Sequence, residues 1–340
     1  MSPSDPLRIA VTGGAGYIGS HTAALLLEAG HDVLIVDSFL NADTDVPDRI
    51  ARIAGGAAPR VETADITDAD ALARALRPFR PQALIHFAGL KAVGEANEQP
   101  LEYYRVNVGG SLTLFREMQE IACNRLVFSS SATVYGDPRQ VPIPEDHPLV
   151  PTNPYGQSKR MVEQVIEDWG RAWPDLSAVN LRYFNPVGAH PSAVIGEAPQ
   201  GTPNNLMPYV AQVAAGWRDR LSVFGDDYDT PDGTGVRDYI HVMDLAEAHL
   251  AALDLTAREP GVHPINVGTG RGYSVMEMIR AFETASGCEI PYVITGRRPG
   301  DIATSLADPA VAAERLNWRA SRALDEMCAD AWRWQRGRNR

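Results

Sequence analysis

The chain has 340 residues and a formal net charge of −12 at pH 7, with 44% hydrophobic and 22% charged residues. These fractions are typical of a globular protein and argue against a disordered or fibrous chain. Because binding to nucleic acid or to an anionic membrane surface requires clustered cations, the acidic balance argues against both kinds of partner.

Targeting signals and cysteine patterns are absent from the sequence. The first residues lack the basic and apolar regions of a secretory signal, and no later apolar run could cross a bilayer, so we expect a cytoplasmic protein. Cys123, Cys288 and Cys328 are far apart and match neither a disulfide framework nor a zinc motif. We therefore expect no metal site.

Apolar segments with strand character recur along the first half of the chain, at residues 9–12, 33–37, 83–87, 126–129 and 178–181. Longer amphipathic or alanine-rich segments, such as residues 69–75, separate them and are typical of helices. This alternation predicts a parallel sheet with helices on both faces.

The pattern changes after Arg182. Segments rich in Pro, Gly and Asn at residues 183–186, 199–208 and 225–235 are predicted to be loops, where substrate contacts could lie. A strand near 265–267 and helices near 274–284 and 324–333 follow. We therefore predict an α/β fold, a Rossmann-type doubly wound parallel sheet with a smaller C-terminal α/β substrate lobe.

A glycine-rich turn, Gly13-Gly14-Ala15-Gly16-Tyr17-Ile18-Gly19, follows the first strand and precedes a helix and a second strand that ends at Asp37. Such glycines permit a tight turn and a close approach of backbone to a pyrophosphate, and the helix N-terminus offers free N–H groups. Asp37 can accept hydrogen bonds from an adenosine ribose and would repel a 2′-phosphate. The predicted cofactor is therefore NAD rather than NADP, although Asp37 could also be a turn residue.

Tyr155 and Lys159 are four residues apart, on one face of a helix that Pro154 can begin. A cation on that face favours the phenolate and so favours general base catalysis, although the same spacing also fits a solvated helix face. Ser131 follows the fifth strand, at the sheet edge where ligands bind in open α/β folds. The three residues together indicate an acid–base site beside the dinucleotide.

The Gly-x-x-Gly-x-x-Gly spacing resembles the extended short-chain dehydrogenase/reductase superfamily, in which the Ser, Tyr and Lys form one catalytic unit. Nearly the whole chain is similar to the UDP-glucose 4-epimerase family, through segments 87–95, 129–137, 181–191, 204–208 and 232–244. The resemblance implies reversible C4 epimerisation of UDP-glucose and UDP-galactose through a transient 4-keto sugar. NAD would stay bound, and Tyr155 would be the base.

The resemblance also implies two sets of binding residues. The implied cofactor-binding residues are Gly13, Gly16, Tyr17, Ile18, Gly19, Asp37, Asn41, Asp65, Ile66, Phe87, Ala88, Gly89, Lys91, Asn107, Ser129, Tyr155, Lys159 and Phe184. The implied substrate-binding residues are Lys91, Ser131, Tyr155, Asn185, Asn204, Asn205, Leu206, Leu221, Val223, Phe224, Arg237, Arg298, Asp301 and Ser305. Two of these arginines, at 237 and 298, are the local cations that an acidic protein needs to hold a pyrophosphate. Surface ion pairing is the alternative explanation for both.

The expected division of the chain is not a single boundary. We assign residues 1–182 to an NAD-binding Rossmann domain, to which the chain returns at about 236–267. Residues 183–235 and 268–340 then form a UDP-sugar-binding lobe. The resemblance further implies a homodimer that pairs the helices after Pro100 and Pro154 with their copies.

Two departures from related enzymes are informative. Ala132 and Thr133 stand where the dehydratases of the superfamily carry an Asp-Glu pair, so elimination of water is not expected. Ser305 stands where a tyrosine accompanies restriction to plain hexoses, so UDP-GlcNAc and UDP-GalNAc are expected to be accepted as well. The alternative is that Ser305 is simply a small loop residue.

Two rival functions stay open at this point. Another NAD-dependent nucleotide-sugar enzyme, such as a uronate epimerase or a decarboxylase, should carry an extra cation for the C6 carboxylate, and no such cation is evident. A non-catalytic dinucleotide-binding regulator could share the fold, since fold does not fix function. Such regulators commonly lack the Tyr or the Lys, and both are present here.

Overall fold

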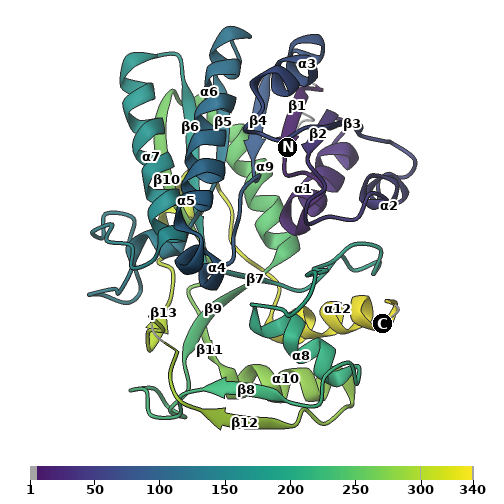
Figure 1. The fold of residues 1–340 in the computed structure, drawn as a ribbon, viewed down its shortest axis with the longest axis vertical. Helices are drawn as coiled ribbons and strands as arrows, with labels where there is room; N and C mark the ends of the chain where they lie inside the picture. Colours follow the sequence, from purple (N-terminus) through teal and green to yellow (C-terminus); the bar gives the residue numbers. More distant parts are fainter. Residues whose placement is uncertain (1–5, 299, 339–340) are drawn as a thin grey trace.

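A seven-stranded parallel sheet forms the centre of the larger domain in this computed structural model, which describes residues 6–298 and 300–338 (Figure 1). The strand order is β10-β6-β5-β4-β1-β2-β3, and each neighbouring pair is parallel. The predicted doubly wound α/β fold is therefore confirmed. The strands are β1 (Arg8–Thr12), β2 (Asp32–Asp37), β3 (Arg60–Thr63), β4 (Ala83–His86), β5 (Arg125–Ser131), β6 (Ser177–Tyr183) and β10 (Gly261–Val267).

The alternation of side chains along each strand produces two cores. Val11 and Ile35 point to one face of the sheet and pack in one hydrophobic cluster with α1 and α9, whereas Ala10 and Leu34 point to the other face. The second cluster includes residues of α3, α6 and α7. Helices therefore cover both faces, as the apolar strands require. The helices are α1 (Tyr17–Glu28), α3 (Ala69–Phe79), α6 (Ser111–Glu120), α7 (Pro154–Ala172) and α9 (Val242–Arg258).

Shorter elements connect these layers. They are α2 (Val46–Ile53), α4 (Val93–Glu98), α5 (Pro100–Tyr103), the π-helix η1 (Tyr104–Gly110), the 3₁₀ turn η2 (Ala132–Tyr135) and α11 (Ala310–Arg315).

The smaller lobe has two small sheets and three helices around a third hydrophobic cluster. In the first sheet, β9 lies between β11 and β13 and also pairs with β7; in the second, β8 pairs with β12. The strands are β7 (Asn185–Val187), β8 (Leu221–Phe224), β9 (Val236–His241), β11 (Gly272–Ser274), β12 (Tyr292–Thr295) and β13 (Thr304–Ser305). The helices are α8 (Leu206–Ala214), α10 (Val275–Ser286) and α12 (Leu324–Arg336).

The structure differs from the sequence-based prediction in three segments. Residues 183–186 are not a loop, because β6 continues to Tyr183 and β7 begins at Asn185, where it pairs with β9. The predicted loop 199–208 ends early, since α8 begins at Leu206. The return of the chain near residue 236 begins with β9, which pairs within the smaller sheet, so only α9 and β10 enter the larger domain.

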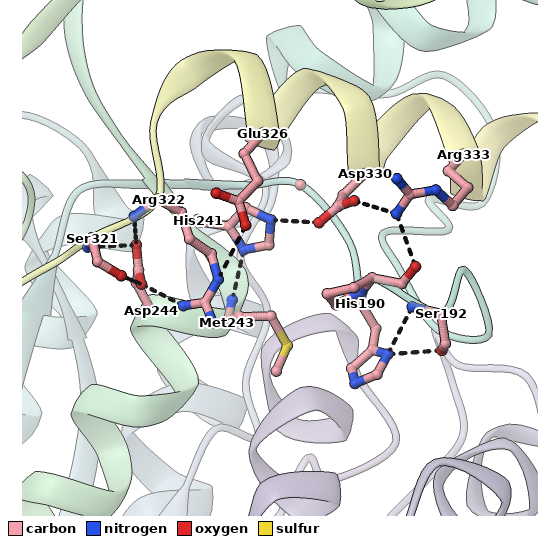
Figure 2. A network of polar contacts seen from close by, with 12 residues as sticks. His190, Ser192, His241, Met243, Asp244, Ser321, Arg322, Glu326, Asp330 and Arg333 are labelled. Carbon is pink, nitrogen blue, oxygen red and sulfur yellow. Dashed lines mark hydrogen bonds and ion pairs between the residues drawn. The ribbon is translucent and has the colours of Figure 1, made fainter.

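Figure 2 shows how α12 is anchored to the junction of β9 and α9. The Asp330 carboxylate lies 3.3 Å from Nε2 of the buried His241 and also pairs with Arg333. Just before the helix begins, Arg322 pairs with the buried Asp244 of α9. These pairs fix the last helix against a segment that joins the two lobes.

His86 is a buried core histidine whose ring nitrogens contact Thr12 Oγ1 at 2.7 Å and Ser111 Oγ at 2.9 Å. The three cysteines are free. Within residues 6–298 and 300–338, no helix is long and apolar enough to span a membrane.

Candidate active site

The glycine turn between β1 and α1 lies against the segment after β4. Gly13 has φ +71°, and a Cβ there would lie 2.6 Å from the backbone N of Ala88. Only glycine therefore permits this approach. Gly16 is the N-cap of α1 and offers no side-chain cap, so the N–H groups of the first turn, at Tyr17, Ile18 and Gly19, are not occupied by a capping side chain. This arrangement fits a dinucleotide pyrophosphate.

Asp37 ends β2 and is tied to the same turn. Its carboxylate accepts hydrogen bonds from the backbone N of Ala15 and of Phe39, each at 2.9 Å. Burial raises the pKa of Asp37, and these backbone donors lower it. Because an ionised carboxylate has about four acceptor positions, two backbone donors still leave room for ribose hydroxyls.

The segment that follows β4 is held by a buried amide. Asn107 Oδ1 accepts from the backbone N of Leu90 at 2.8 Å, and its Nδ2 donates to Leu90 O and to Ser158 Oγ, both at 3.0 Å. Asn107 lies in the π-helix η1, an irregularity that is frequent at functional sites. It therefore joins the predicted cofactor segment, residues 87–91, to the helix that carries Tyr155.

The three predicted catalytic residues converge at the carboxyl end of β5. Ser131 ends that strand, and Tyr155 and Lys159 lie one turn apart on α7. Lys159 Nζ donates to the backbone O of Ser129 at 2.7 Å and lies 5.9 Å from the centre of the Tyr155 ring. Burial lowers the pKa of Lys159 to about 8, although the nearby Glu163 carboxylate raises it.

Burial and hydrogen bonding act in opposite directions on the pKa of Tyr155. Burial raises the pKa of its phenol, and a hydrogen bond with Ser131 lowers it. Lys159 makes no hydrogen bond to the phenol among those described. Burial of the phenol therefore opposes the effect expected of the Lys159 cation, because desolvation disfavours the charged phenolate.

Sequence reasoning missed the buried ion pair behind this centre. Glu163 lies one turn beyond Lys159, and its carboxylate accepts from Arg182 Nη2 at 2.7 Å and from Ser130 Oγ at 2.5 Å. The side chains of Glu163 and Arg182 are 0% and 3% exposed. The four-residue spacing of Tyr155, Lys159 and Glu163 is the signal that could have indicated it.

A second group of predicted residues gathers in the smaller lobe. Arg298 pairs with Asp301, with Nε 2.9 Å from Oδ2, and its guanidinium lies 4.7 Å from the centre of the Phe224 ring. Phe224 is 38% exposed. A planar cation beside an exposed aromatic ring suits a nucleotide, since the ring can stack on a base and the cation can pair with phosphate oxygens.

Arg237 and Ser305 are paired across neighbouring strands. Ser305 of β13 is the register partner of Arg237 in β9, and both side chains are half-buried. Arg237 Nη1 donates to the backbone O of Val236 at 2.9 Å. The pairing places the residue predicted to set the size of the sugar pocket beside a residue predicted to bind phosphate.

Two of the predicted substrate-binding residues have their side chains in the core. Leu221 and Val223 are 3% and 1% exposed and pack in the hydrophobic cluster of the smaller lobe. Because side chains alternate along a strand, only Ser222 and Phe224 of β8 turn to the other face. Leu221 and Val223 therefore offer a ligand mainly their backbone, and their part in substrate binding stays a prediction.

The remaining predicted residues are spread around these two groups. Tyr17 donates to Gly188 O at 2.7 Å and so joins α1 to the segment after β7. The side chain of Lys91 pairs with Glu197 at 3.3 Å, and Asn205 Nδ2 donates to the same carboxylate at 3.0 Å. The other predicted binding residues differ in exposure: Asn41, Asp65, Gly89 and Asn204 are exposed, Asn185 and Leu206 are half-buried, and Ile66 and Phe184 are buried.

Comparisons with known proteins show which family the chain belongs to. Residues 9–268 match the NAD dependent epimerase/dehydratase family. The chain is 54% identical to a UDP-glucose 4-epimerase of Bacillus subtilis, over 97% of each chain. It is 52% identical to that of Homo sapiens, over 97% of this chain and 96% of the relative.

Solved structures show the same likeness. A UDP-glucose 4-epimerase from Stenotrophomonas maltophila, with bound NAD and formylated UDP-arabinopyranose, has a TM-score of 0.95 at 50% identity and covers 97% of this chain and 98% of its own. One from Bifidobacterium longum, in complex with NAD+ and UDP, has a TM-score of 0.94 at 47% identity, with the same coverage. The chain therefore belongs to the NAD-dependent epimerase/dehydratase family and, within it, to the UDP-glucose 4-epimerases, which are NAD-using isomerases.

Proposed function

We propose that the chain interconverts UDP-glucose and UDP-galactose at C4 through a transient 4-keto sugar, with Tyr155 as the base. The observation that carries this proposal is the convergence of Ser131, Tyr155 and Lys159 at the carboxyl end of β5. Nearby, the glycine turn is shaped for a dinucleotide, because any side chain on Gly13 would collide with the backbone of Ala88. A redox cofactor and an acid–base group would thus meet at one sheet edge.

Each residue has a distinct part in the proposed reaction. Tyr155 takes the proton of the sugar O4 hydroxyl and later returns it, and Ser131 orients that oxygen. Lys159 holds the catalytic end of α7 to β5 through Ser129 O and offers its ammonium to the cofactor ribose. NAD, when bound, supplies the oxidation and reduction at C4 and a positive charge that favours the Tyr155 phenolate.

The nucleotide is proposed to be held by the smaller lobe. Arg237 and Arg298 would pair with the pyrophosphate, and Phe224 would stack on the uracil. The Bifidobacterium longum relative was solved with UDP, which supports a UDP site in this chain. The 4-keto hexose must turn over so that hydride can return to its opposite face, whereas UDP stays fixed. Strong contacts should therefore concentrate on the nucleotide.

The first test is turnover of UDP-galactose by purified protein without added cofactor, with chromatographic detection of UDP-glucose. Tyr155→Phe removes the proton-transferring oxygen, so kcat should fall by a factor of about 10² to 10⁴. Tyr292→Phe is the matched control, because Tyr292 is 45% exposed on β12 and should keep full activity. Absence of product from wild type, even with NAD supplied, would reject the proposal.

A second proposal concerns N-acetyl sugars, which we expect to be substrates because Ser305 is small. A structure titled UDP-Glc/GlcNAc 4-epimerase, from Campylobacter jejuni, has a TM-score of 0.85 at 35% identity and supports this broader substrate range. Ser305→Tyr should abolish turnover of UDP-GlcNAc and keep that of UDP-galactose, whereas Ser305→Ala should change neither. If wild type leaves UDP-GlcNAc unconverted, the Ser305 proposal is wrong.

The homodimer is the third proposal. Leu101 of α5 is 82% exposed, and Leu112 of α6 and Met161 of α7 are each 40% exposed, so apolar side chains face outward on the helices predicted to pair. Sedimentation of wild type should give a dimer, and Leu101→Glu together with Met161→Glu should give a monomer. A monomeric wild type would contradict this proposal. A cytoplasmic location stays a prediction from the sequence.

A further inference from the structure

Glu197 lies between the two lobes, and the proposed mechanism does not use it. Its Oε1 atom is 3.3 Å from Lys91 Nζ and 3.0 Å from Asn205 Nδ2. The Glu197 side chain is only 10% exposed, whereas that of Lys91 is 66% exposed. Lys91 follows β4 of the larger domain, and Asn205 precedes α8 of the smaller lobe. One carboxylate oxygen therefore connects two predicted ligand-binding residues from different lobes.

The position of Glu197 is set by α12 and not by these two partners. Trp334 Nε1 donates to Glu197 O at 3.0 Å, and Arg333 Nη1 donates to Pro191 O at 2.8 Å, so the helix holds this loop at two points. A Cβ on Gly196 would lie 2.6 Å from the Trp334 ring, so glycine lets the backbone rest on the indole. Figure 2 shows how Asp330 and His241 anchor α12 nearby.

The contacts of Glu197 leave its partners free to bind a ligand. Asn205 is the N-cap of α8 but makes no capping hydrogen bond, and its Nδ2 donates to Glu197 instead. Its Oδ1 and the first-turn N–H groups of α8 therefore stay available for a nucleotide. Lys91 has three ammonium donors, of which Glu197 takes one. A buried acceptor on a fixed backbone thus orients a flexible lysine and an amide.

We propose that Glu197 is a positioning residue that fixes Lys91 and Asn205 relative to each other across the two lobes and so sets how tightly the UDP-sugar is held. The inference rests on the proposed function, because it takes Lys91 and Asn205 as substrate contacts. Free rotation of the Lys91 stem and of the Asn205 amide would otherwise be lost on binding, which weakens affinity.

The test uses the holoenzyme and compares Glu197→Ala and Glu197→Gln with Glu259→Gln. The control removes the charge of a glutamate that likewise pairs with a cation, Arg315, at 2.5 Å, but at the edge of the large sheet. For Glu197→Ala, the Kd of UDP by calorimetry and the KM of UDP-galactose should both rise about tenfold, with a smaller change in kcat. Glu197→Gln keeps an acceptor but loses the charge, so its Kd and KM should lie between those of wild type and of Glu197→Ala.

A double-mutant cycle separates positioning from a general structural effect. If Glu197 acts through Asn205, Glu197→Ala should weaken UDP binding less in an Asn205→Ala background than in wild type. Trp334→Phe removes the donor to Glu197 O but keeps a ring, and should raise the Kd in the same direction by a smaller factor.

Three outcomes overturn the inference. If the Kd and KM values of Glu197→Ala lie within twofold of wild type, this inference is overturned and the proposed function is not. The same holds if Glu197→Ala has a lower melting temperature and an unchanged Kd. A wild type that epimerises UDP-galactose keeps the proposed function intact in both cases. A wild type that neither binds UDP nor forms product would overturn the proposed function and this inference together.

Discussion

Two arginine–carboxylate pairs in this molecule have nearly the same geometry and opposite surroundings. Arg182 and Glu163, behind the catalytic residues, meet at 2.7 Å with side chains 3% and 0% exposed. Arg298 and Asp301, in the smaller lobe, meet at 2.9 Å with side chains 52% and 23% exposed. Contact distance alone therefore does not distinguish a pair that fixes a catalytic site from one that can exchange partners.

The surroundings explain the different uses. The buried pair has lost its water, so each charge depends on the other and on further donors such as Ser130 Oγ. It holds β5, α7 and β6 in one arrangement. The exposed pair is solvated, so a phosphate can replace the Asp301 carboxylate at low cost. Fixed geometry suits the proposed proton transfer, and exchangeable partners suit the proposed role of Arg298 in holding and releasing a nucleotide.

The largest effect is expected from breaking the buried pair. Glu163→Gln leaves Arg182 as a buried, uncompensated charge, so the free energy of unfolding should fall by about 3 to 5 kcal/mol. Urea unfolding measures this change. A loss below about 1 kcal/mol would show that the buried pair is no more important than a surface pair, and the comparison would fail.

The next effect concerns ligand binding and not stability. Arg298→Ala removes the planar cation, so the Kd of UDP should rise by a factor of about 10 to 100 while the melting temperature stays near that of wild type. Titration calorimetry gives the Kd. Arg297→Gln is the matched control, because Arg297 is the preceding residue and forms a similar exposed pair with Asp227 at 2.7 Å. Equal losses in both variants would argue against a specific phosphate contact of Arg298.

The third effect is a pH dependence from Lys159. Its pKa is lowered by burial from 10.5 to about 8, so its ammonium is lost in the folded protein above about pH 8. We expect kcat/KM to fall there by about tenfold per pH unit, because the neutral amine no longer stabilises the phenolate. A pH profile that stays flat up to pH 10 would exclude this role.

The lowered pKa of Lys159 has the opposite effect on stability, which should increase with pH where activity decreases. Between about pH 8 and 10.5 the unfolded chain binds the Lys159 proton and the folded chain does not, so this group's contribution to stability rises with pH. Lys159→Met should remove that rise. Unfolding of the free protein in urea at several pH values measures it.

The smallest effect is expected from breaking an exposed ion pair on α7, the helix that carries Glu163. Arg171 and Asp168 form a pair whose side chains are 68% and 60% exposed. Arg171→Gln should change the free energy of unfolding by less than about 0.5 kcal/mol and leave kcat unchanged. A larger loss would indicate that exposure does not determine the strength of these pairs.

Much of the fold was predictable because its signals are local. Buried parallel strands need apolar residues on both faces, so β1, β2, β4, β5 and β6 stand out in the sequence. By contrast, β3 is exposed along its whole length and β13 has only two residues, so neither has an apolar pattern to detect. The loop predicted at residues 183–186 is a strand only because β9 lies beside it.

The sequence by itself determined the glycine turn, the Tyr155–Lys159 spacing and the acid at Asp37, because each depends on neighbours within one βαβ unit or one helix turn. Only the tertiary structure decided that Glu163 meets Arg182, that Leu221 and Val223 turn inward, and that Glu197 joins Lys91 to Asn205. These contacts join residues far apart in the chain. Their energies depend on burial, which no local pattern specifies.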